Sequence, residues 1–200
     1  MSRTSYNCIL ARHTETDWNV QDRHSGQSNQ PALTALGIVQ ALGLASRFTG
    51  SSYTAPTELH GIHGITKIVC SDLRRAVHTA LIVAAHLGGP VPILDSRLRE
   101  LSVGQMDGLT KTEALQRFTD PYFSTRHPDY DFRAIGGECR AGVIRRYHEA
   151  FQEHIGFGGV CLIVGHGTAL RTLLEDCGVT TPIGQGGFVP LLYPSKILDL

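Results

Sequence analysis

Short apolar runs alternate with longer helix-forming segments along most of this chain. The apolar runs of strand length are Tyr6–Ala11, Ile65–Cys70, Val91–Leu94, Gly159–Val164 and Phe188–Tyr193. The helix-forming segments are Leu33–Phe48, Arg74–Leu87, Thr110–Phe118, Glu138–His154 and Thr168–Cys177. Strands that alternate with helices are typical of an α/β fold. We therefore predict a three-layer α/β/α fold with a mostly parallel central sheet, in a single domain over residues 1–200.

The ends of two helices can also be predicted. Thr34 can cap the helix at 33–48. We assign the buried apolar face of that helix to Leu36, Val39, Leu42 and Leu44. Gly88, Gly89 and Pro90 should end the helix at 74–87. The segment 49–64 is rich in Gly, Ser, Thr and Pro, so it predicts a surface loop, and 119–134 predicts an irregular segment.

Charge and cysteine content narrow the classes of function and location. Eighteen Lys and Arg residues balance eighteen Asp and Glu residues, so we expect neither nucleic acid nor a membrane surface as partner. No apolar run approaches the roughly 18 residues of a membrane span, and the first ten residues do not resemble a signal peptide. The five cysteines form no CxxC pair, which favours reduced thiols over zinc or disulfides and predicts a cytoplasmic protein.

Three polar clusters directly follow predicted strands. Arg12 and His13 follow the first strand, Ser71–Arg75 follows the second, and His166 with Gly167 follows the strand that ends at Val164. In parallel sheets, ligands bind beyond the carboxyl ends of the strands. We therefore expect these clusters to meet in one active site.

The residue types in these clusters suit phosphoryl transfer. Arg12 and Arg75 offer forked guanidinium groups that match phosphate oxygens. An imidazole such as that of His13 can attack phosphorus, which splits the reaction into two easier steps. Glu100 could protonate the leaving oxygen and then take a proton from water, although the neighbouring acids Asp95 and Asp107 remain alternatives. This scheme requires no metal and no cofactor.

Several motifs follow one another in order along the chain. The first is Leu10-Ala11-Arg12-His13-Thr14-Glu15-Thr16-Asp17-Trp18-Asn19, and the second is Cys70–Ala80. They resemble the first and second signatures of the histidine phosphatase superfamily, which includes the cofactor-dependent phosphoglycerate mutases. The acidic residue and the glycines of Leu98–Gly108 and the final motif Val164-Gly165-His166-Gly167-Thr168 follow in order. Gly136-Gly137-Glu138 is a weaker match.

The resemblance implies a role for each matching residue. His13 is expected to be the phosphorylated nucleophile, and Glu100 the proton donor. Arg12, Arg75 and His166 are expected to bind the transferring phosphoryl group. The residues expected to line the phosphate pocket are Asn19, Ser25, Gly26, Gly167 and Thr168. Thr14 stands where the family usually has glycine, which would strain the backbone if that position required a positive φ.

Three functions are compatible with these residues. The leading hypothesis is a phosphatase that hydrolyses a small phosphorylated metabolite through a phosphohistidine on His13. The alternative is a cofactor-dependent phosphoglycerate mutase, which is usually longer between the acid and the last motif; here residues 101–165, only 65 residues, separate Glu100 from His166. A non-catalytic binding module with the same fold ranks third. Such proteins generally lose the nucleophile or an arginine, whereas this chain retains all five site residues. His60 and His63 could supply half of a metal site, but a loop without a metal is the simpler interpretation.

Overall fold

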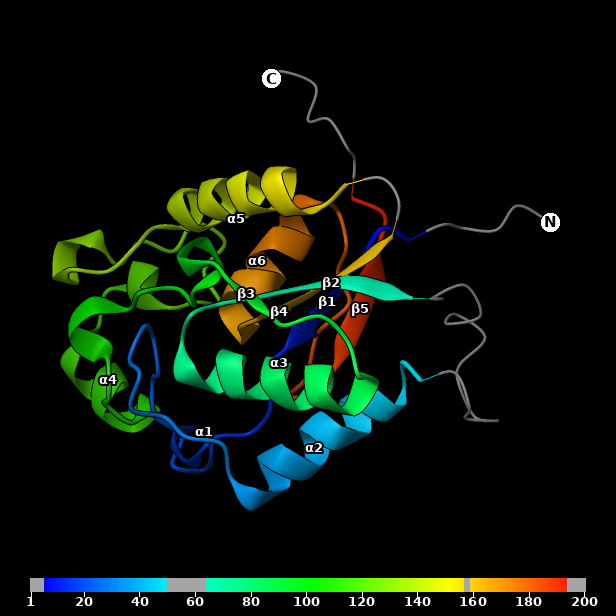
Figure 1. The fold of residues 1–200 in the computed structure, drawn as a ribbon. Helices are drawn as coiled ribbons and strands as arrows, with labels where there is room; N and C mark the ends of the chain where they lie inside the picture. Colours follow the sequence, from blue (N-terminus) through cyan, green and yellow to red (C-terminus); the bar gives the residue numbers. More distant parts are fainter. Residues whose placement is uncertain (1–5, 50–63, 157–158, 194–200) are drawn as a thin grey trace.

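Five strands form one central sheet in the order β3-β2-β4-β1-β5 (Figure 1). The computed structural model describes residues 6–49, 64–156 and 159–193. The strands are β1 (Cys8–Arg12), β2 (Ile65–Cys70), β3 (Ile93–Leu94), β4 (Val160–Gly165) and β5 (Phe188–Leu191). The pairs β1–β4, β2–β4 and β2–β3 are parallel, whereas β5 runs antiparallel to β1 at one edge. The prediction of a mostly parallel sheet is confirmed.

The strand register brings three chain segments to the same edge of the sheet. Arg12, the last residue of β1, lies opposite Gly165, the last residue of β4. Cys70 at the end of β2 lies opposite Val164 of β4. The residues that follow these strands therefore leave the sheet side by side, as the three polar clusters in the sequence predicted.

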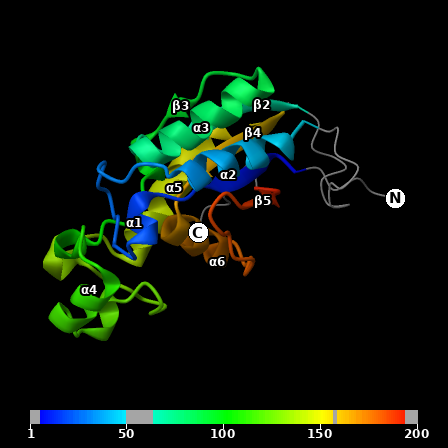
Figure 2. The same ribbon diagram turned by 90° about the horizontal axis from the view of Figure 1, so that it is seen from below.

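Helices cover both faces of the sheet (Figures 1 and 2). One face carries α2 (Ala35–Ser46) and α3 (Arg74–Leu87), and the other carries α5 (Arg140–His154) and α6 (Gly167–Asp176). Alternate residues of β1 enter the two cores: Ile9 and Ala11 pack with the α2 and α3 side, and Leu10 packs with the other. This period of two in a strand buried on both sides explains its continuous apolar sequence. The three-layer α/β/α class is confirmed.

The buried face of α2 differs from the predicted one. Leu36, Val39 and Leu42 are exposed, and the helix instead buries Gly37, Ala41, Leu44 and Ala45. The reason is close packing: a Cβ on Gly37 would lie 2.2 Å from the carbonyl oxygen of Glu15. Small side chains therefore decide which side of α2 faces the protein, and apolar periodicity does not. The predicted cap is confirmed, because Thr34 Oγ1 accepts the N–H of Gly37 at 3.0 Å.

The remaining elements agree with the sequence prediction to within a few residues. The helix α4 (Lys111–Arg117) begins after the capping residue Thr110, and 119–134 contains short 3-10 helices, turns and one isolated β-bridge. The short helix α1 (Asp17–Val20) was not predicted. α4 and the residues after it lie apart from the sheet, beyond α1 (Figure 2). Most of the predicted loop at 49–64 lies outside the described residues.

The cysteines and the question of a membrane-spanning helix bear on where the protein is located in the cell. All five cysteines are free, and Cys8, Cys70 and Cys161 are buried among apolar side chains. No helix in the described part of the chain is long and apolar enough to cross a membrane.

Candidate active site

His13 is held by the backbone of two strands in a defined protonation state. It directly follows β1, and its N–H donates to the carbonyl oxygen of Gly165 on β4 at 2.9 Å. Its ring Nδ1 lies 2.8 Å from the carbonyl oxygen of Thr14. A carbonyl oxygen only accepts, so Nδ1 carries the proton and Nε2 keeps a lone pair. Burial, followed by the positive charges of Arg75 and Arg12, holds the pKa of His13 well below 6.5. At neutral pH the ring is therefore an uncharged nucleophile.

His166 lies beside His13 as the N-cap residue of α6. The centroids of the two imidazole rings are 5.1 Å apart. The ring of His166 is fully buried, and neither nitrogen has a hydrogen-bond partner among the described residues. Burial and the charge of Arg75 hold its pKa well below 6.5. Buried polar groups normally have partners, so an unpaired imidazole beside the nucleophile is suited to a ligand oxygen.

Two arginines supply the positive charge at this end of the sheet. Arg75, in the first turn of α3, is 1% exposed and donates to the carbonyl oxygens of Gly26 at 2.7 Å and Ser28 at 2.8 Å. Burial lowers its pKa to about 10, so it remains protonated at pH 7. The Nε atoms of Arg12 and Arg75 are both buried without a partner among the described residues. Each guanidinium thus retains an N–H group for a ligand.

Glu100 lies across the cavity, against the start of α6. Its Oε2 accepts the N–H of Thr168 at 3.0 Å, and its Oε1 accepts the N–H of Ala169 at 2.9 Å and of Leu101 at 2.8 Å. A carboxylate oxygen has two lone pairs, so Oε2 can still accept or release a proton toward the cavity.

The two alternative acids lie elsewhere. Asp95 pairs with Arg97 and His154; although burial opposes it, these bonds lower the pKa of Asp95 to about 2. Burial of its carboxyl group raises the pKa of Asp107 to about 6, a value that would suit an acid. The Asp107 carboxyl, however, lies against Gly26 and faces a separate surface groove beside Trp18. Location therefore favours Glu100.

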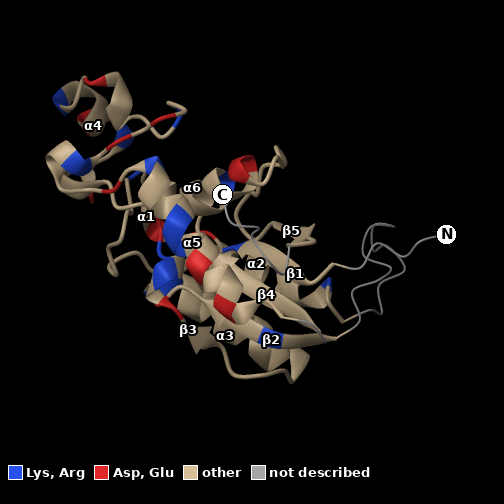
Figure 3. Ribbon diagram, turned by 90° about the horizontal axis from the view of Figure 1, so that it is seen from above, with Lys and Arg blue, Asp and Glu red and all other residues tan. Residues whose placement is uncertain are grey.

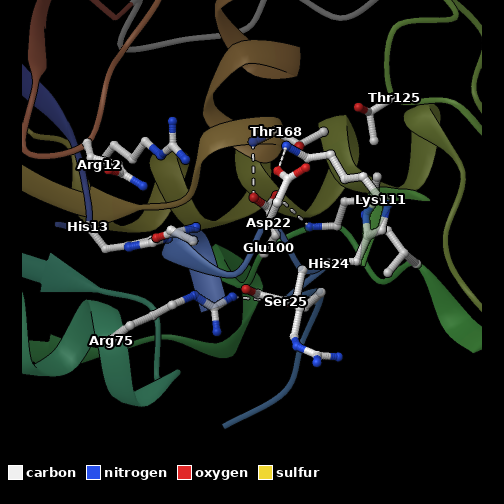
Figure 4. Close-up of a pocket in the computed structure, with 16 residues that line it drawn as sticks. Arg12, His13, Asp22, His24, Ser25, Arg75, Glu100, Lys111, Thr125 and Thr168 are labelled. Atoms are coloured by element: carbon white, nitrogen blue, oxygen red, sulfur yellow. Dashed lines mark hydrogen bonds and ion pairs between the residues drawn. The ribbon is translucent and has the colours of Figure 1, made fainter. Parts of the chain in front are cut away.

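A cavity of about 260 Å³ joins these groups (Figure 4). We call Arg12, His13 and Arg75, together with His166 beside His13, the floor of the cavity. Of the predicted phosphate-pocket residues, Asn19, Ser25, Gly26 and Thr168 line this cavity, as does Glu100. Gly167 instead lines an adjoining cavity of about 310 Å³, which shares Arg12, Glu100 and Thr168. His166 is not among the residues that line the cavity, and its ring lies beside that of His13, which does line it.

Two glycines are required by close contacts in the site. Gly26 has a φ of +34°, and a Cβ there would lie 2.3 Å from Oδ1 of Asp107. A Cβ on Gly167 would lie 2.9 Å from Cζ of Arg12. Larger residues would displace the loop from Arg75 or displace Arg12 from the start of α6.

Thr14 does not have the backbone strain that glycine would have relieved. Among the described residues, Asp22 is the only one other than glycine with a positive φ. The Thr14 hydroxyl lies 3.2 Å from that of Thr79 on α3, and the Thr14 N–H donates to the same oxygen at 3.3 Å. The side chain thus joins the loop after β1 to α3.

The structure adds residues that the sequence analysis did not assign to the site. We call Asp22, Arg23, His24, Lys111, Thr125 and Gln185 the mouth of the cavity; all of them line it. They come from the loop after α1, the start of α4, the segment after α4 and the loop before β5. No local motif marks them, because their proximity depends on how distant loops fold together.

Sequence comparison decides the family. The sequence model of the histidine phosphatase superfamily (branch 1) matches residues 8–185. The chain belongs to this superfamily. Its members are phosphoryl-transfer enzymes, and the match includes every predicted site residue. That residues 1–200 form one such domain remains a prediction.

Relatives of this superfamily member include proteins named for two different activities. A protein of Salmonella newport named "Probable phosphoglycerate mutase GpmB" is 36% identical over 173 residues, which cover 83% of this chain and 72% of that protein. A mycobacterial glucosyl-3-phosphoglycerate phosphatase solved in complex with VO3 is 27% identical, with a TM-score of 0.74; the match covers 92% of this chain and 91% of that one. YhfR of Bacillus stearothermophilus is 27% identical over 96% of this chain and 97% of its own, with a TM-score of 0.71. The comparisons thus include both a mutase-like relative and a phosphatase.

Proposed function

We propose that this protein is a phosphatase that hydrolyses small phosphomonoesters through a phosphohistidine on His13. The observation that carries the proposal is the state of the His13 ring. Its Nδ1 proton is committed to the Thr14 carbonyl oxygen, its pKa is lowered, and its Nε2 is free beside two guanidinium groups. A neutral imidazole next to fixed cations can approach a phosphoryl group whose negative charge those cations offset.

In the first step, Arg12, Arg75 and His166 bind the oxygens of the phosphoryl group. Nε2 of His13 attacks phosphorus, and the bond from phosphorus to the leaving oxygen breaks. Glu100 donates a proton to that oxygen, so the product leaves as an alcohol. The positive charge that develops on the ring is stabilised by the bond from Nδ1–H to the Thr14 carbonyl oxygen.

In the second step, Glu100 takes a proton from water while the water oxygen attacks phosphorus. The bond between Nε2 and phosphorus breaks, and inorganic phosphate leaves. The step needs neither a redox partner nor a cofactor. In the described ranges, no three His, Cys, Asp or Glu side chains gather into a metal site, while His60 and His63 lie outside those ranges. The arginines supply the cations.

The experiment that tests this function traps the intermediate. A phosphohistidine is labile in acid and stable in base, the reverse of an aspartyl phosphate. Rapid quenching into alkali during turnover, followed by peptide mass spectrometry, should place the phosphate on the peptide containing His13. His13→Ala should abolish both label and turnover, whereas His86→Ala, an exposed histidine on α3, should change neither. Label on a serine or aspartate, or near-normal activity of His13→Ala, would refute the proposal.

A phosphoglycerate mutase is the second candidate, because a relative at 36% identity carries that name. Both activities use the same floor, and they differ in whether water or a second substrate oxygen receives the phosphoryl group. Incubation with 3-phosphoglycerate separates them: a phosphatase releases inorganic phosphate or leaves the compound unchanged, and a mutase forms 2-phosphoglycerate.

The partner of the proposed enzyme is a small phosphorylated metabolite, supported by the small volume and polar lining of the cavity. The proposed location is the cytoplasm, supported by five free cysteines, since reduced thiols persist there.

A further inference from the structure

The mouth of the cavity contains an ion pair between two segments far apart in the sequence. Lys111, the first residue of α4, pairs through Nζ with Oδ1 of Asp22 in the loop after α1. The backbone supports this pair, because the N–H of Lys111 donates to the carbonyl oxygen of Asp22 at 2.9 Å. Figure 4 shows the two side chains meeting beside the pocket. The only lysine that lines the described cavity is thus already matched by a carboxylate.

The backbone of Asp22 gives this pairing a local cause. Its φ is 53°, in the left-handed region that Asp, Asn and Gly tolerate best. The neighbouring residues Arg23 and Thr110 form an isolated antiparallel bridge. The turn therefore holds Asp22 opposite Lys111 before any ligand arrives, and asparagine can replace it without altering the preferred backbone.

The other titratable groups of the mouth either bond to polar partners or are uncharged. Arg23 donates to the carbonyl oxygen of Gly108 at 2.6 Å. Glu113 on α4 accepts the N–H and the hydroxyl of Thr110, the bridge partner of Arg23; these hydrogen bonds, and then the charge of Arg23, lower the pKa of Glu113. Burial and then the charge of Lys111 lower the pKa of His24, which is therefore neutral at pH 7. Figure 3 shows acidic and basic segments next to one another around α4.

The mouth therefore differs in charge from the floor. Unpaired guanidinium N–H groups of Arg12 and Arg75 lie at the floor, where a phosphoryl group is proposed to bind. The uncharged polar side chains Asn19, Ser25, Thr125 and Gln185 also line the cavity. Such amides and hydroxyls can bond to hydroxyl groups of a ligand. A second anion that approached Lys111 would have to displace Asp22 from it or lie beside the negative charge of Asp22.

We propose that Asp22 determines specificity by excluding a second acidic group, so that the preferred substrates are phosphomonoesters of neutral, hydroxyl-bearing alcohols. This inference rests on the proposed phosphatase function. Asp22 acts by occupying the lysine that would otherwise attract a carboxylate or a second phosphate. Specificity of this kind comes from disfavouring the wrong ligand as much as from binding the right one.

Two ligands that share a carbon skeleton test the idea. Glycerol 3-phosphate and 3-phosphoglycerate differ in a hydroxymethyl group against a carboxylate. The inhibition constant of each compound is measured in low-salt buffer with p-nitrophenyl phosphate as the substrate. This measurement does not depend on turnover of either compound. The wild-type protein should bind glycerol 3-phosphate more tightly. In Asp22→Asn the ratio of the two inhibition constants should shift toward 3-phosphoglycerate by about 3-fold, the order expected when one exposed charge is removed in low-salt buffer.

Two further variants separate this role from a general effect of charge. Glu153→Gln removes a carboxylate of similar exposure (61%, against 63% for Asp22) that pairs with Arg97 and does not line the cavity, so it should leave the ratio unchanged. Lys111→Met added to Asp22→Asn should erase the gain, because the freed lysine is its source.

The inference fails if the wild-type protein prefers 3-phosphoglycerate, if Asp22→Asn leaves the ratio as it is, or if the double variant keeps the gain. It also fails if neither compound competes with p-nitrophenyl phosphate. Absence of p-nitrophenyl phosphate hydrolysis in the wild-type protein, with no phosphohistidine on His13, would instead refute the proposed function.

Discussion

The floor and the mouth of the cavity are built in opposite ways. The floor residues directly follow strands or begin helices, and His13, Arg75 and His166 are at most 4% exposed. The mouth residues lie on loops and on the start of α4, and Lys111 and Asp22 are 60% and 63% exposed. Buried charges and dipoles act strongly because water does not screen them, whereas exposed charges act weakly. The comparison teaches that the sheet determines the reaction, while the loops tune which substrate enters.

The largest difference between substrates should come from Glu100. As general acid it should matter by about 10²–10⁴-fold in kcat/KM for an alkyl phosphate, whose leaving group needs a proton. Glu100→Gln should have a much smaller effect on p-nitrophenyl phosphate, since nitrophenolate leaves without protonation. Steady-state kinetics on both substrates measure the difference. Equal losses on the two substrates would point to another acid, and Asp107→Asn, on the far side of Gly26, is the matched comparison.

Replacing one arginine of each region should show the contrast between floor and mouth directly. Arg75→Lys keeps the positive charge but loses the forked guanidinium group, which binds two backbone carbonyl oxygens and is proposed to bind the ligand. The kcat/KM of this variant should therefore fall by about 100-fold. Arg23→Lys in the mouth should change it by less than about 5-fold. Circular dichroism should show that both variants are folded. Similar losses for the two would contradict the division of roles.

Acid should destabilise the protein through the floor. His13 and His166 have native pKa values well below 6.5, whereas in the unfolded chain they return to about 6.5. Below that pH the unfolded state binds more protons, so the free energy of unfolding should fall as the pH falls. Urea unfolding at about pH 7.5 and pH 5.5 measures this loss. The loss should be smaller in His166→Gln and unchanged in His86→Gln; equal losses in all three proteins would contradict the assignment.

Chelation should have the smallest effect. The arginines of the floor provide the positive charge, so activity on p-nitrophenyl phosphate should be unchanged in excess EDTA. The control is the same assay in EDTA with added Mg²⁺ or Zn²⁺. A loss of activity that either metal restores would overturn the proposed mechanism.

The parts of the molecule that could be predicted from the sequence depend on local signals. β2 and α3 have the predicted bounds, because an apolar run and a Gly-Gly-Pro stop are read from neighbouring residues. The floor was predictable because its residues directly follow buried strands, and parallel strands end at one edge.

The parts that could not be predicted depend on distant contacts. Asp22 and Lys111 are 89 positions apart, and nothing near either residue indicates the other. The predicted buried face of α2 was wrong except for Leu44, because Gly37 packs on the carbonyl group of Glu15, a contact that apolar periodicity does not encode. Gly167, which was expected in the phosphate pocket, lines the adjoining cavity.

The two bonds from Arg75 to the carbonyl oxygens of Gly26 and Ser28 couple ligand binding to folding. A phosphoryl group that binds the Arg75 guanidinium is linked through it to the loop containing Gly26 and Ser28. Binding of the ligand therefore stabilises Arg75 and this loop together against thermal unfolding. Because a ligand that binds only the native state stabilises it by an amount that grows with the logarithm of its concentration divided by its Kd, inorganic phosphate and phosphorylated compounds can be ranked by thermal shift at equal concentration. That ranking requires no knowledge of the reaction, and the inactive His13→Ala protein, which retains Arg75, can hold an unhydrolysed substrate in place long enough for it to be identified.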